Sequence, residues 1–376
     1  MTTRADTVPI TVAADELVRV VTECLTAVGV GRADAEVVAD VLVTADLGGI
    51  DSHGVSRLRR YVDGIRRGTI AADNRTSIVR EGPTTAVLDA GNGLGQPAMT
   101  RAVGLAIDKA REYGTAAVTV RRSNHFGVAG YYARLGARAG LLTIVTTNAT
   151  PQVAPTNGAE RMLGTNPLAI ALPTAVDEPF VFDAATSVVP RGRLERMAGR
   201  GVGDIGAGWV IDGEGRPATD LRDILAGLRL PDRHAMLPLG GAGEDFGGHK
   251  GFGLGMIADL LCGPLAGARW GRHVYGSDGA GLGHFVLCVD VGHLTTPAEF
   301  RSEAARMFAE IRGTRPATGA PSVRIAGDQE RASRRHGRRY GIPLDADVAA
   351  AVAALAGDLE VDPPRRVRAP DEEQPT

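Results

Sequence analysis

The chain has little of what marks several large classes of protein. Three cysteines in 376 residues are too few and too scattered for a disulfide framework or a cysteine-rich zinc site. The N-terminal stretch MTTRADTVPITVAADEL has no apolar core of the kind found in a signal peptide. No apolar run approaches the roughly 20 residues that a membrane span needs. We therefore expect a cytoplasmic protein that does not insert into a membrane.

The chain also lacks a surplus of either charge. Lys and Arg number 42 against 44 Asp and Glu, a net charge of −2. This balance excludes a strongly basic nucleic-acid binder and gives no electrostatic reason to bind a membrane surface. The eight histidines show no metal-binding spacing, so we expect no metal site. Lysine is scarce, since only Lys109 and Lys250 occur, and a lysine that persists is a candidate for a role that arginine cannot fill.

Hydrophobic periodicity divides the chain into parts. Residues 10–70 and the residues after the Thr296-x-x-Glu299 capping box follow helical spacing. Between them we expect a helix at 97–114 and short strands at 85–89, 116–120, 141–147, 168–172, 180–183, 209–212 and 285–291. We predict a helical part at 1–82, an α/β domain at 83–295, C-terminal helices at 296–362 that pack with the N-terminal ones, and a disordered tail at 363–376.

The segment from Ser52 to Arg57 is the first candidate for chemistry. Asp51 or Ser52 can cap a helix, which would place His53 and Arg57, four residues apart, on one helix face. A histidine beside an arginine can move a proton next to a bound carboxylate. The alternative is a capped helix that carries a surface histidine and arginine without further function.

Three further polar segments adjoin predicted strands. They are Ser123–Gly127 with His125, the irregular stretch Asn148–Pro173 with Thr165, and Asp183–Ser187. Polar residues at strand ends are a common place for functional groups, and long irregular segments are often binding loops. Each also has a structural alternative, because the same residues cap helices and hold loops.

A glycine-rich loop at Gly247–Gly255 leads into a predicted helix. It contains His249 and Lys250, and glycines at a helix N-terminus allow an anion to approach backbone N–H groups. The alternative is a flexible glycine turn. The string Gly201-x-Gly203-x-x-Gly206 is no dinucleotide fingerprint, because neither a strand before it nor a helix after it is predicted.

These segments in this order resemble the malate/L-lactate dehydrogenase family, NAD(P)-dependent oxidoreductases unrelated to the Rossmann-type lactate dehydrogenases. Relatives include sulfolactate and ureidoglycolate dehydrogenases, 2,3-diketogulonate reductase and piperideine-2-carboxylate reductase. The matching stretches are 51–68, 122–133, 163–174, 182–195, 249–268 and 340–345. The resemblance implies an α/β fold of the α+β kind, with a helical domain from both chain ends and an unusual, mostly antiparallel nucleotide-binding sheet.

The resemblance also implies roles for individual residues. His53 and His125 match catalytic histidines, Ser52 and Asp183 match a Ser–His–Asp relay, and Arg57 matches the arginine that holds the substrate carboxylate. Asn148 and Thr165, with His125, are further candidates for substrate binding. The nucleotide-binding stretches correspond to Phe182, Asp183, Ala184, Thr186, Ser187, Val188, His249, Lys250, Gly327 and Asp328.

We therefore expect hydride transfer between nicotinamide and C2 of a small 2-oxo or 2-hydroxy acid. The cofactor is NAD or NADP, with NAD favoured, and the unit is a homodimer with its active site near the interface. We favour His53 as the acid in the reducing direction, with His125 polarising the substrate. The alternatives are reduction of a cyclic 2-imino acid, a lyase that forms a Schiff base at Lys250, and a ligand-binding protein without activity.

Overall fold

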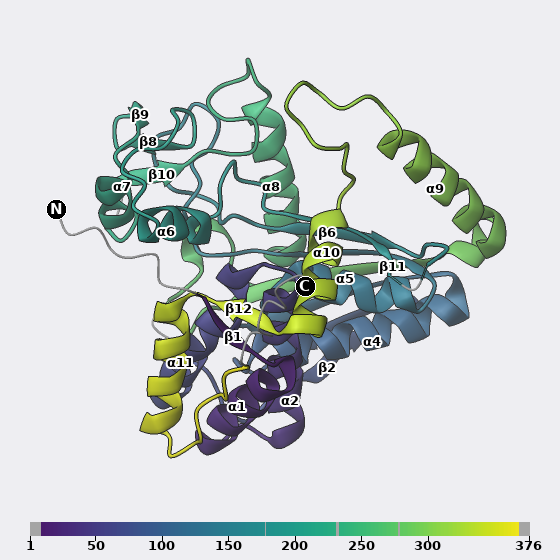
Figure 1. The fold of residues 1–376 in the computed structure, drawn as a ribbon. Coiled ribbons are helices and arrows are strands. Elements are labelled where there is room, and N and C mark those ends of the chain that lie inside the picture. Colours follow the sequence, from purple (N-terminus) through teal and green to yellow (C-terminus); the bar gives the residue numbers. More distant parts are fainter. Residues whose placement is uncertain (1–8, 177, 231–232, 277–278, 368–376) are drawn as a thin grey trace, which may run out of the picture.

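The computed structural model describes residues 9–367 apart from 177, 231–232 and 277–278. Figure 1 shows a central sheet, a helical part below it and a smaller part above it that carries a second sheet. In the described part of the chain, no helix is long and apolar enough to cross a membrane.

Seven strands form the central sheet, in the order β2 (Ser77–Glu81), β3 (Thr85–Asp89), β4 (Thr115–Ser123), β11 (Leu282–Asp290), β5 (Leu141–Thr147), β6 (Leu168–Leu172) and β7 (Phe180–Ala184). The pair β3–β4 is parallel, and the other neighbouring pairs of this sheet are antiparallel. Because a Rossmann sheet consists of parallel strands, the prediction of a mostly antiparallel, non-Rossmann sheet is confirmed.

Helices cover both faces of this sheet. In Figure 1, α4 (Gly95–Tyr113) and α5 (Ala129–Arg138) lie beneath it, and α8 (Gly248–Cys262) lies above it. Ala98, Ala102 and Ala106 of α4 are fully buried at helical spacing in the same core as Val118 and Val286 of the sheet. Small side chains let the helix approach closely, and the buried apolar area holds the layers together.

The helical part is built from both ends of the chain. It contains α1 (Ala14–Ala27), α2 (Arg32–Leu47), α3 (Leu58–Arg66) and α11 (Ala346–Asp358). The strand β1 (Ile10–Val12) pairs antiparallel with β12 (Ile342–Leu344), which ties the two ends together. Leu17 and Leu25 of α1 share a buried core with Val352 and Leu355 of α11.

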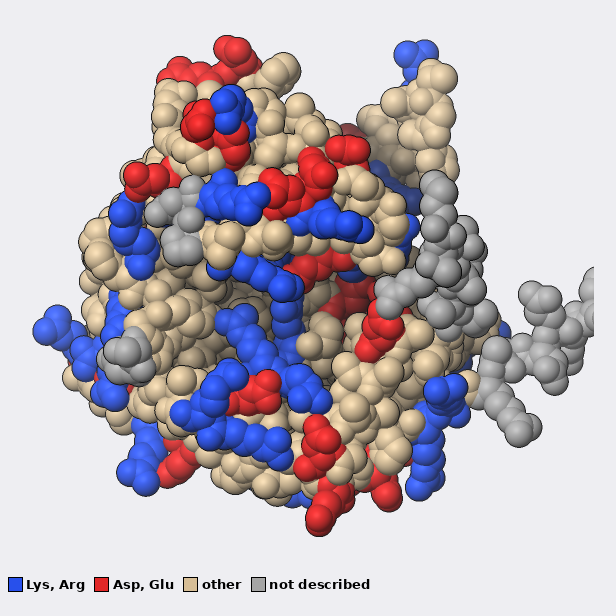
Figure 2. Space-filling model, turned by 90° about the vertical axis from the view of Figure 1, so that its left-hand side faces the viewer, with Lys and Arg blue, Asp and Glu red and all other residues tan. Residues whose placement is uncertain are grey.

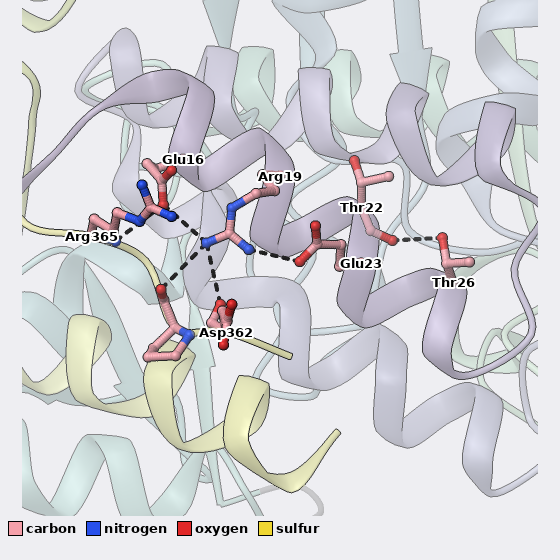
Figure 3. A network of polar contacts seen from close by, with 8 residues as sticks. Glu16, Arg19, Thr22, Glu23, Thr26, Asp362 and Arg365 are labelled. Atoms are coloured by element: carbon pink, nitrogen blue, oxygen red, sulfur yellow. Dashed lines mark hydrogen bonds and ion pairs between the residues drawn. The ribbon is translucent and has the colours of Figure 1, made fainter. Parts of the chain in front are cut away.

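The segment after α11 is also attached to α1. Figure 3 shows the guanidinium of Arg19, which binds Glu16 and Glu23 of its own helix and donates to the backbone oxygen of Asp362. Val367 N–H donates to Thr11 O of β1. Our expectation of disorder from residue 363 was therefore wrong for 363–367, because their backbone finds partners on β1 and α1. Residues 368–376 lie outside the described residues.

The smaller part packs around its own core. It consists of α6 (Arg191–Gly199), α7 (Leu221–Gly227) and a sheet of β10 (His234–Met236), β8 (Val210–Asp212) and β9 (Pro217–Ala218). The core side chains are Leu194, Val210, Leu221 and Met236. The helix α9 (Pro297–Arg312) lies at the edge of the molecule in Figure 1 and buries none of its residues, and its Phe308 stacks on Phe180 of β7. A long segment connects it to α10 (Asp328–Tyr340).

Local sequence signals predict most of the long elements. The Thr296 hydroxyl accepts the Glu299 N–H at the start of α9, as the capping box predicts. The expected glycine loop at 247–255 was wrong, because α8 already begins at Gly248. Gly251 is there for close packing, since a Cβ would lie 2.0 Å from Leu239 O. The helices α5, α6, α7 and α10 were not among our predictions.

Candidate active site

Two histidines from distant parts of the chain stack on each other. His53 ends the 3-10 turn η1 (Asp51–His53), and His125 lies in the loop after β4. Their ring centroids are 5.6 Å apart, with 23° between the ring planes. The fold thus joins the first two sequence motifs, and we call these residues the histidine pair.

The segment that carries His53 differs from the helix start we expected. Residues 51–53 and 55–57 form two separate 3-10 turns, and Gly54 between them is extended. The helix α3 begins only at Leu58 and has no side-chain cap. The expected cap by Asp51 or Ser52 was therefore wrong, and His53 and Arg57 do not share an α-helical face.

A buried carboxyl group of α2 fixes this conformation. Asp46 accepts the Val55 N–H at 2.8 Å. Gly54 lies so close to Asp46 that a Cβ would fall 1.8 Å from Oδ1, so no larger residue fits there without movement. Burial raises the pKa of Asp46 to about 8. The turn beside His53 is thus set by a residue that no sequence motif indicated.

The hydrogen bonds of His125 determine which form of the ring is favoured. Gly127 N–H donates to His125 Nδ1 at 3.3 Å, and the buried Tyr61 hydroxyl lies 2.7 Å from the same nitrogen. Because a backbone N–H can only donate, Nδ1 acts as the acceptor and the hydrogen of the neutral ring sits on Nε2. His125 is therefore prepared to donate a hydrogen bond from Nε2.

Burial and positive charge keep the histidine pair neutral. Burial, and then the guanidiniums of Arg57, Arg60 and Arg196, lower the pKa of His53 to about 4. Burial also lowers the pKa of His125 well below its ordinary value, with Arg60 as the largest charged contributor. An anion bound beside these arginines would offset their charge and raise both pKa values.

Ser52 and Arg57 complete this part of the site. The Ser52 hydroxyl lies 2.9 Å from His53 Nδ1, and Arg57 Nε donates to the backbone oxygen of Ser52. In the described part of the chain, no hydrogen bond uses the terminal nitrogens of Arg57. Figure 2 shows Lys and Arg side chains around a hollow on the side of the molecule where α6, α7 and α11 lie.

A second set of predicted residues lines a cavity beside β7, which we call the β7 cavity. Its volume is about 300 Å³, and its lining includes Phe182, Asp183 and Gly327 together with Arg134 and Arg334. The Nε atoms of both arginines are buried and have no hydrogen-bond partner among the described residues. Burial and the neighbouring Arg334 lower the pKa of Arg134 to about 10. Three arginines, with Arg324, against Asp183 and Glu330 leave the described lining with a net positive charge, which suits an anionic group.

Asp183 does not join Ser52 and His53 in the described contacts. Its Oδ2 accepts the Gly130 N–H at 2.6 Å, and burial raises its pKa to about 6. The relay through Asp183 stays a prediction.

Several other predicted site residues use their polar groups inside the protein. The Thr186 hydroxyl lies 3.1 Å from the backbone oxygens of Thr165 and Asn166 and shares its one hydrogen between them, and Ser187 donates to Val189 O at 2.9 Å. Ala184 pairs with Leu168 at the end of β7, and Val188 N–H donates to Leu237 O. The hydroxyls of Thr186 and Ser187 thus have structural partners, and the predicted cofactor contacts of these residues and of Ala184 and Val188 stay predictions.

Asn148 belongs to a buried polar network. Its amide donates to Asp259 Oδ1 and to Arg269 O, and it accepts the Gly283 N–H at 3.0 Å. Thr165 is half-buried and bonds Thr186 through its backbone oxygen. The side chain of Asn148 thus has its partners within the fold, and its proposed substrate contact stays a prediction.

The remaining predicted residues lie at helix ends. His249 and Lys250 are exposed in the first turn of α8. An amine that forms a Schiff base is usually activated by burial, so the exposure of Lys250 gives the lyase alternative no support. Asp328 begins α10 and binds the Arg312 guanidinium through both oxygens. In the described residues no cluster of three or more metal-ligating side chains occurs.

Sequence reasoning missed Asp46, Tyr61 and Arg60 near the histidine pair. Tyr61 and Arg60 are adjacent in α3, and their helical spacing gave only an ordinary amphipathic pattern. Asp46 carried a weak signal, because an acidic residue stands among the apolar residues of α2. Buried charged side chains are uncommon without a partner, and this one contacts the backbone beside His53.

Comparisons with known proteins agree with this arrangement. A family model described as malate/L-lactate dehydrogenase matches residues 12–353. A malate dehydrogenase from Pyrococcus horikoshii is 42% identical over 332 residues, which cover 88% of this chain and 90% of that protein. A (2R)-3-sulfolactate dehydrogenase (NADP(+)) from Chromohalobacter salexigens is 37% identical over 278 residues, or 72% and 78% of the two chains. The crystal structure of a malate dehydrogenase from Entamoeba histolytica superposes with a TM-score of 0.91 at 34% identity, covering 94% of this chain and 99% of that one.

Proposed function

The chain belongs to the malate/L-lactate dehydrogenase family, whose members use NAD or NADP, and from this premise we propose its reaction and the roles of its residues. It transfers a hydride between C4 of nicotinamide and C2 of a small 2-hydroxy or 2-oxo acid. The observation that carries these roles is the stacked pair of His53 and His125 beside Arg57. This arrangement supplies a proton carrier, a hydrogen-bond donor and a carboxylate-binding group together.

The residues of the β7 cavity fit part of a dinucleotide. Arg134 and Arg334 line the cavity together with Arg324, and their positive charges would attract an anionic phosphate. Phe182 offers an aromatic ring, and Asp183 a carboxyl group that can accept from a ribose hydroxyl. Gly327 has a φ of 85°, a conformation that favours glycine, in the backbone at the edge of the cavity. When bound, the cofactor supplies or accepts the hydride.

Arg57 holds the carboxylate at C1 of the substrate. Its Nε is engaged by Ser52 O, so the guanidinium is fixed while both terminal nitrogens remain for a ligand. Two parallel hydrogen bonds from these nitrogens would bind and orient a carboxylate. The bound carboxylate offsets the positive charge near His53 and moves the pKa of this histidine up toward its ordinary value.

The two histidines differ in how readily they can carry a proton. The Ser52 hydroxyl can rotate to donate to His53 Nδ1 or accept from it, so His53 keeps this hydrogen bond in both protonation states. His125 would lose its contact with Gly127 N–H on protonation of Nδ1. We therefore assign proton transfer to His53 and polarisation of the C2 oxygen to the Nε2–H of His125. In the oxidising direction, neutral His53 accepts the hydroxyl proton.

We also propose that two copies of the chain form a homodimer. Leu254, Met256, Ile257 and Leu260 of α8 are between 41% and 54% exposed, and an apolar helix face of this kind is typical of an interface. Light scattering coupled to gel filtration tests this: a mass twice that of the chain supports the dimer, and a monomer contradicts it.

A substrate panel tests the reaction. The purified chain is mixed with NADH or NADPH and with pyruvate, oxaloacetate, sulfopyruvate or piperideine-2-carboxylate, and oxidation is followed at the nicotinamide absorbance. We expect turnover of one or more 2-oxo acids. Turnover of the cyclic imine alone would show that the substrate is a cyclic 2-imino acid and not a 2-oxo acid. If none of the four compounds led to oxidation of the cofactor, the proposed reaction would be rejected. The ratio of rates with the two cofactors chooses between NAD and NADP.

A further inference from the structure

A second cavity opens beside His125, on the side formed by α3, and we call it the α3 cavity. Its volume is about 330 Å³. Arg60, Tyr61 and Arg67 line it together with His125 and Tyr275. Two arginines therefore share one cavity with a histidine of the proposed reaction.

The helix α3 directs both cations to this cavity. Arg60, Gly64 and Arg67 follow each other at intervals of four and three residues, which places them on one face of a helix and its end. A Cβ at position 64 would lie 2.6 Å from the Ile70 side chain. Because Gly64 has none, Ile70 can pack close to the helix here. The spacing of the arginines thus follows from helix geometry.

Tyr275 fixes the position of Arg60. The Arg60 guanidinium lies over the Tyr275 ring, with its central carbon 5.5 Å from the ring centroid, and its Nη2 donates to the Tyr275 hydroxyl. Tyr275 has a φ of 61°, which is uncommon for a bulky residue. Backbone strain of this kind persists where the surroundings hold it and is frequent in ligand-binding sites.

Among the described residues, the charged side chains of the α3 cavity are all positive. Its described lining contains two arginines and no Asp or Glu. No ion pair with a described residue engages Arg60 or Arg67, whereas the neighbouring Arg59 pairs with Asp358 on the outside. Arg60 lines the cavity together with His125 and is also the largest charged contributor to the lowered pKa of His125. An anion bound here would be held beside the reacting centre.

From these contacts we propose that the α3 cavity binds the second anionic group of the substrate, with Arg60 as the residue that selects dianionic 2-oxo and 2-hydroxy acids. Arg57 holds the carboxylate at C1, His125 faces the oxygen at C2, and Arg60, supported by Arg67, binds a carboxylate or sulfonate at the other end. This inference rests on the proposed function and adds the substrate class that the site prefers.

The selectivity of an Arg60→Gln variant tests the inference. Values of kcat/KM are measured for two dianions, oxaloacetate and sulfopyruvate, and for the monoanion pyruvate. We expect kcat/KM for both dianions to fall about 10- to 150-fold, the factor that corresponds to the loss of a hydrogen bond to a charged group. Loss of the Arg60 charge also raises the pKa of both histidines, but this acts on all three acids alike, so the ratio of each dianion value to that of pyruvate should fall by about this factor. An equal loss for all three acids would overturn the inference.

Arg59→Gln is the matched control, because Arg59 is the adjacent arginine of the same helix and makes its ion pair outside the cavity. We expect this variant to keep both the rates and the preference for dianions. If Arg59→Gln lost the preference to the same extent as Arg60→Gln, the surface charge of α3 would explain the effect and the α3 cavity would not.

Binding without turnover separates this inference from the proposed reaction. Tartronate, a dianionic 2-hydroxy acid, and glycolate, its monoanionic counterpart, are titrated into each protein and the heat of binding is recorded. Weaker binding of tartronate by Arg60→Gln, with glycolate unchanged, supports the anion subsite even if the substrate panel shows no oxidation. Equal binding of tartronate by the wild type and by Arg60→Gln, or no binding by the wild type, overturns the inference.

Discussion

The histidine pair and the β7 cavity differ in how their polar groups are satisfied. Around the histidine pair, ring nitrogens meet Ser52, Tyr61 and Gly127, and the loop below is fixed by Asp46. Around the β7 cavity, the Nε atoms of Arg134 and Arg334 have no partner among the described residues, although the Arg334 guanidinium also binds Glu178. The first region is thus organised by contacts within the chain, as proton transfer requires, whereas we propose that a ligand completes the second.

The largest effect should come from His53→Ala, which removes the proposed proton carrier from the organised region. Positioned general acid–base catalysis contributes about 10²–10⁴ in rate, so we expect kcat to fall by about that factor. The affinity for NAD(P)H, measured by cofactor fluorescence, should stay nearly unchanged, because the β7 cavity is intact. The pH dependence of kcat should also flatten.

His125→Ala provides the comparison within the pair. We expect it to raise KM more than it lowers kcat, since His125 is assigned to binding and polarising the substrate. If the pH dependence of kcat instead disappears in the His125 variant and persists in the His53 variant, the two roles must be exchanged.

Arg57→Lys should have the next largest effect. It preserves the charge but not the two parallel hydrogen bonds, so the loss should amount to about 2–3 kcal/mol and appear mainly in KM. Steady-state kinetics with the best acid of the substrate panel measures it. An unchanged KM would show that Arg57 does not bind the substrate carboxylate.

The two regions also differ in how much of them follows from the sequence. Most strands of the central sheet and the helix α4 with its buried alanines are predictable, because their periodicity is local, whereas the exposed edge strand β2 was not among our predictions. The meeting of His53 with His125 is not, because it depends on where α2 and β4 pack. The form of the His53 turn depends on Asp46, a residue outside the motif.

The candidate nucleotide-binding residues are neighbours in the sequence, but they do not all lie in the same place in the structure. Motif resemblance grouped Phe182, Asp183, Thr186 and Ser187 by their adjacency in the sequence. The structure separates them, because β7 ends at Ala184 and the following residues turn into the interior. Phe182 and Asp183 line the β7 cavity, whereas the hydroxyls of Thr186 and Ser187 bind backbone oxygens. Whether a strand-end side chain faces a cavity or the core depends on tertiary contacts that the local sequence does not encode.

Asp46→Asn tests how the loop below the histidine pair is held. The pKa of Asp46 is raised from about 4 to about 8 by burial, so between these values the folded protein binds a proton that the unfolded chain releases. The contribution of this group to stability is therefore greatest at low pH and is lost as the pH rises toward 8. Asparagine keeps an oxygen for Val55 N–H and does not ionise.

We expect the melting temperature of Asp46→Asn relative to the wild type to rise by a few degrees between pH 5 and pH 8. Scanning calorimetry at several pH values measures this difference. A difference that is constant with pH would show that Asp46 does not titrate in this range.

Thr186→Val has the smallest expected effect and distinguishes a structural residue from a lining residue of the β7 cavity. Valine has nearly the shape of threonine but cannot donate to the oxygens of Thr165 and Asn166. The one hydrogen of the Thr186 hydroxyl is then lost, while Thr165 O keeps its bond from the Thr186 N–H, so we expect a net cost of about 1 kcal/mol. The melting temperature should fall by about 2 °C, while the dissociation constant of NAD(P)H stays within about twofold of the wild type.

Phe182→Ala is the matched variant from the cavity lining, because Phe182 is partly exposed and its loss should weaken cofactor binding with little change in stability. If Thr186→Val weakens cofactor binding as much as Phe182→Ala does, the Thr186 hydroxyl contacts the cofactor, and Thr186 then belongs to the lining of the β7 cavity and not to the core.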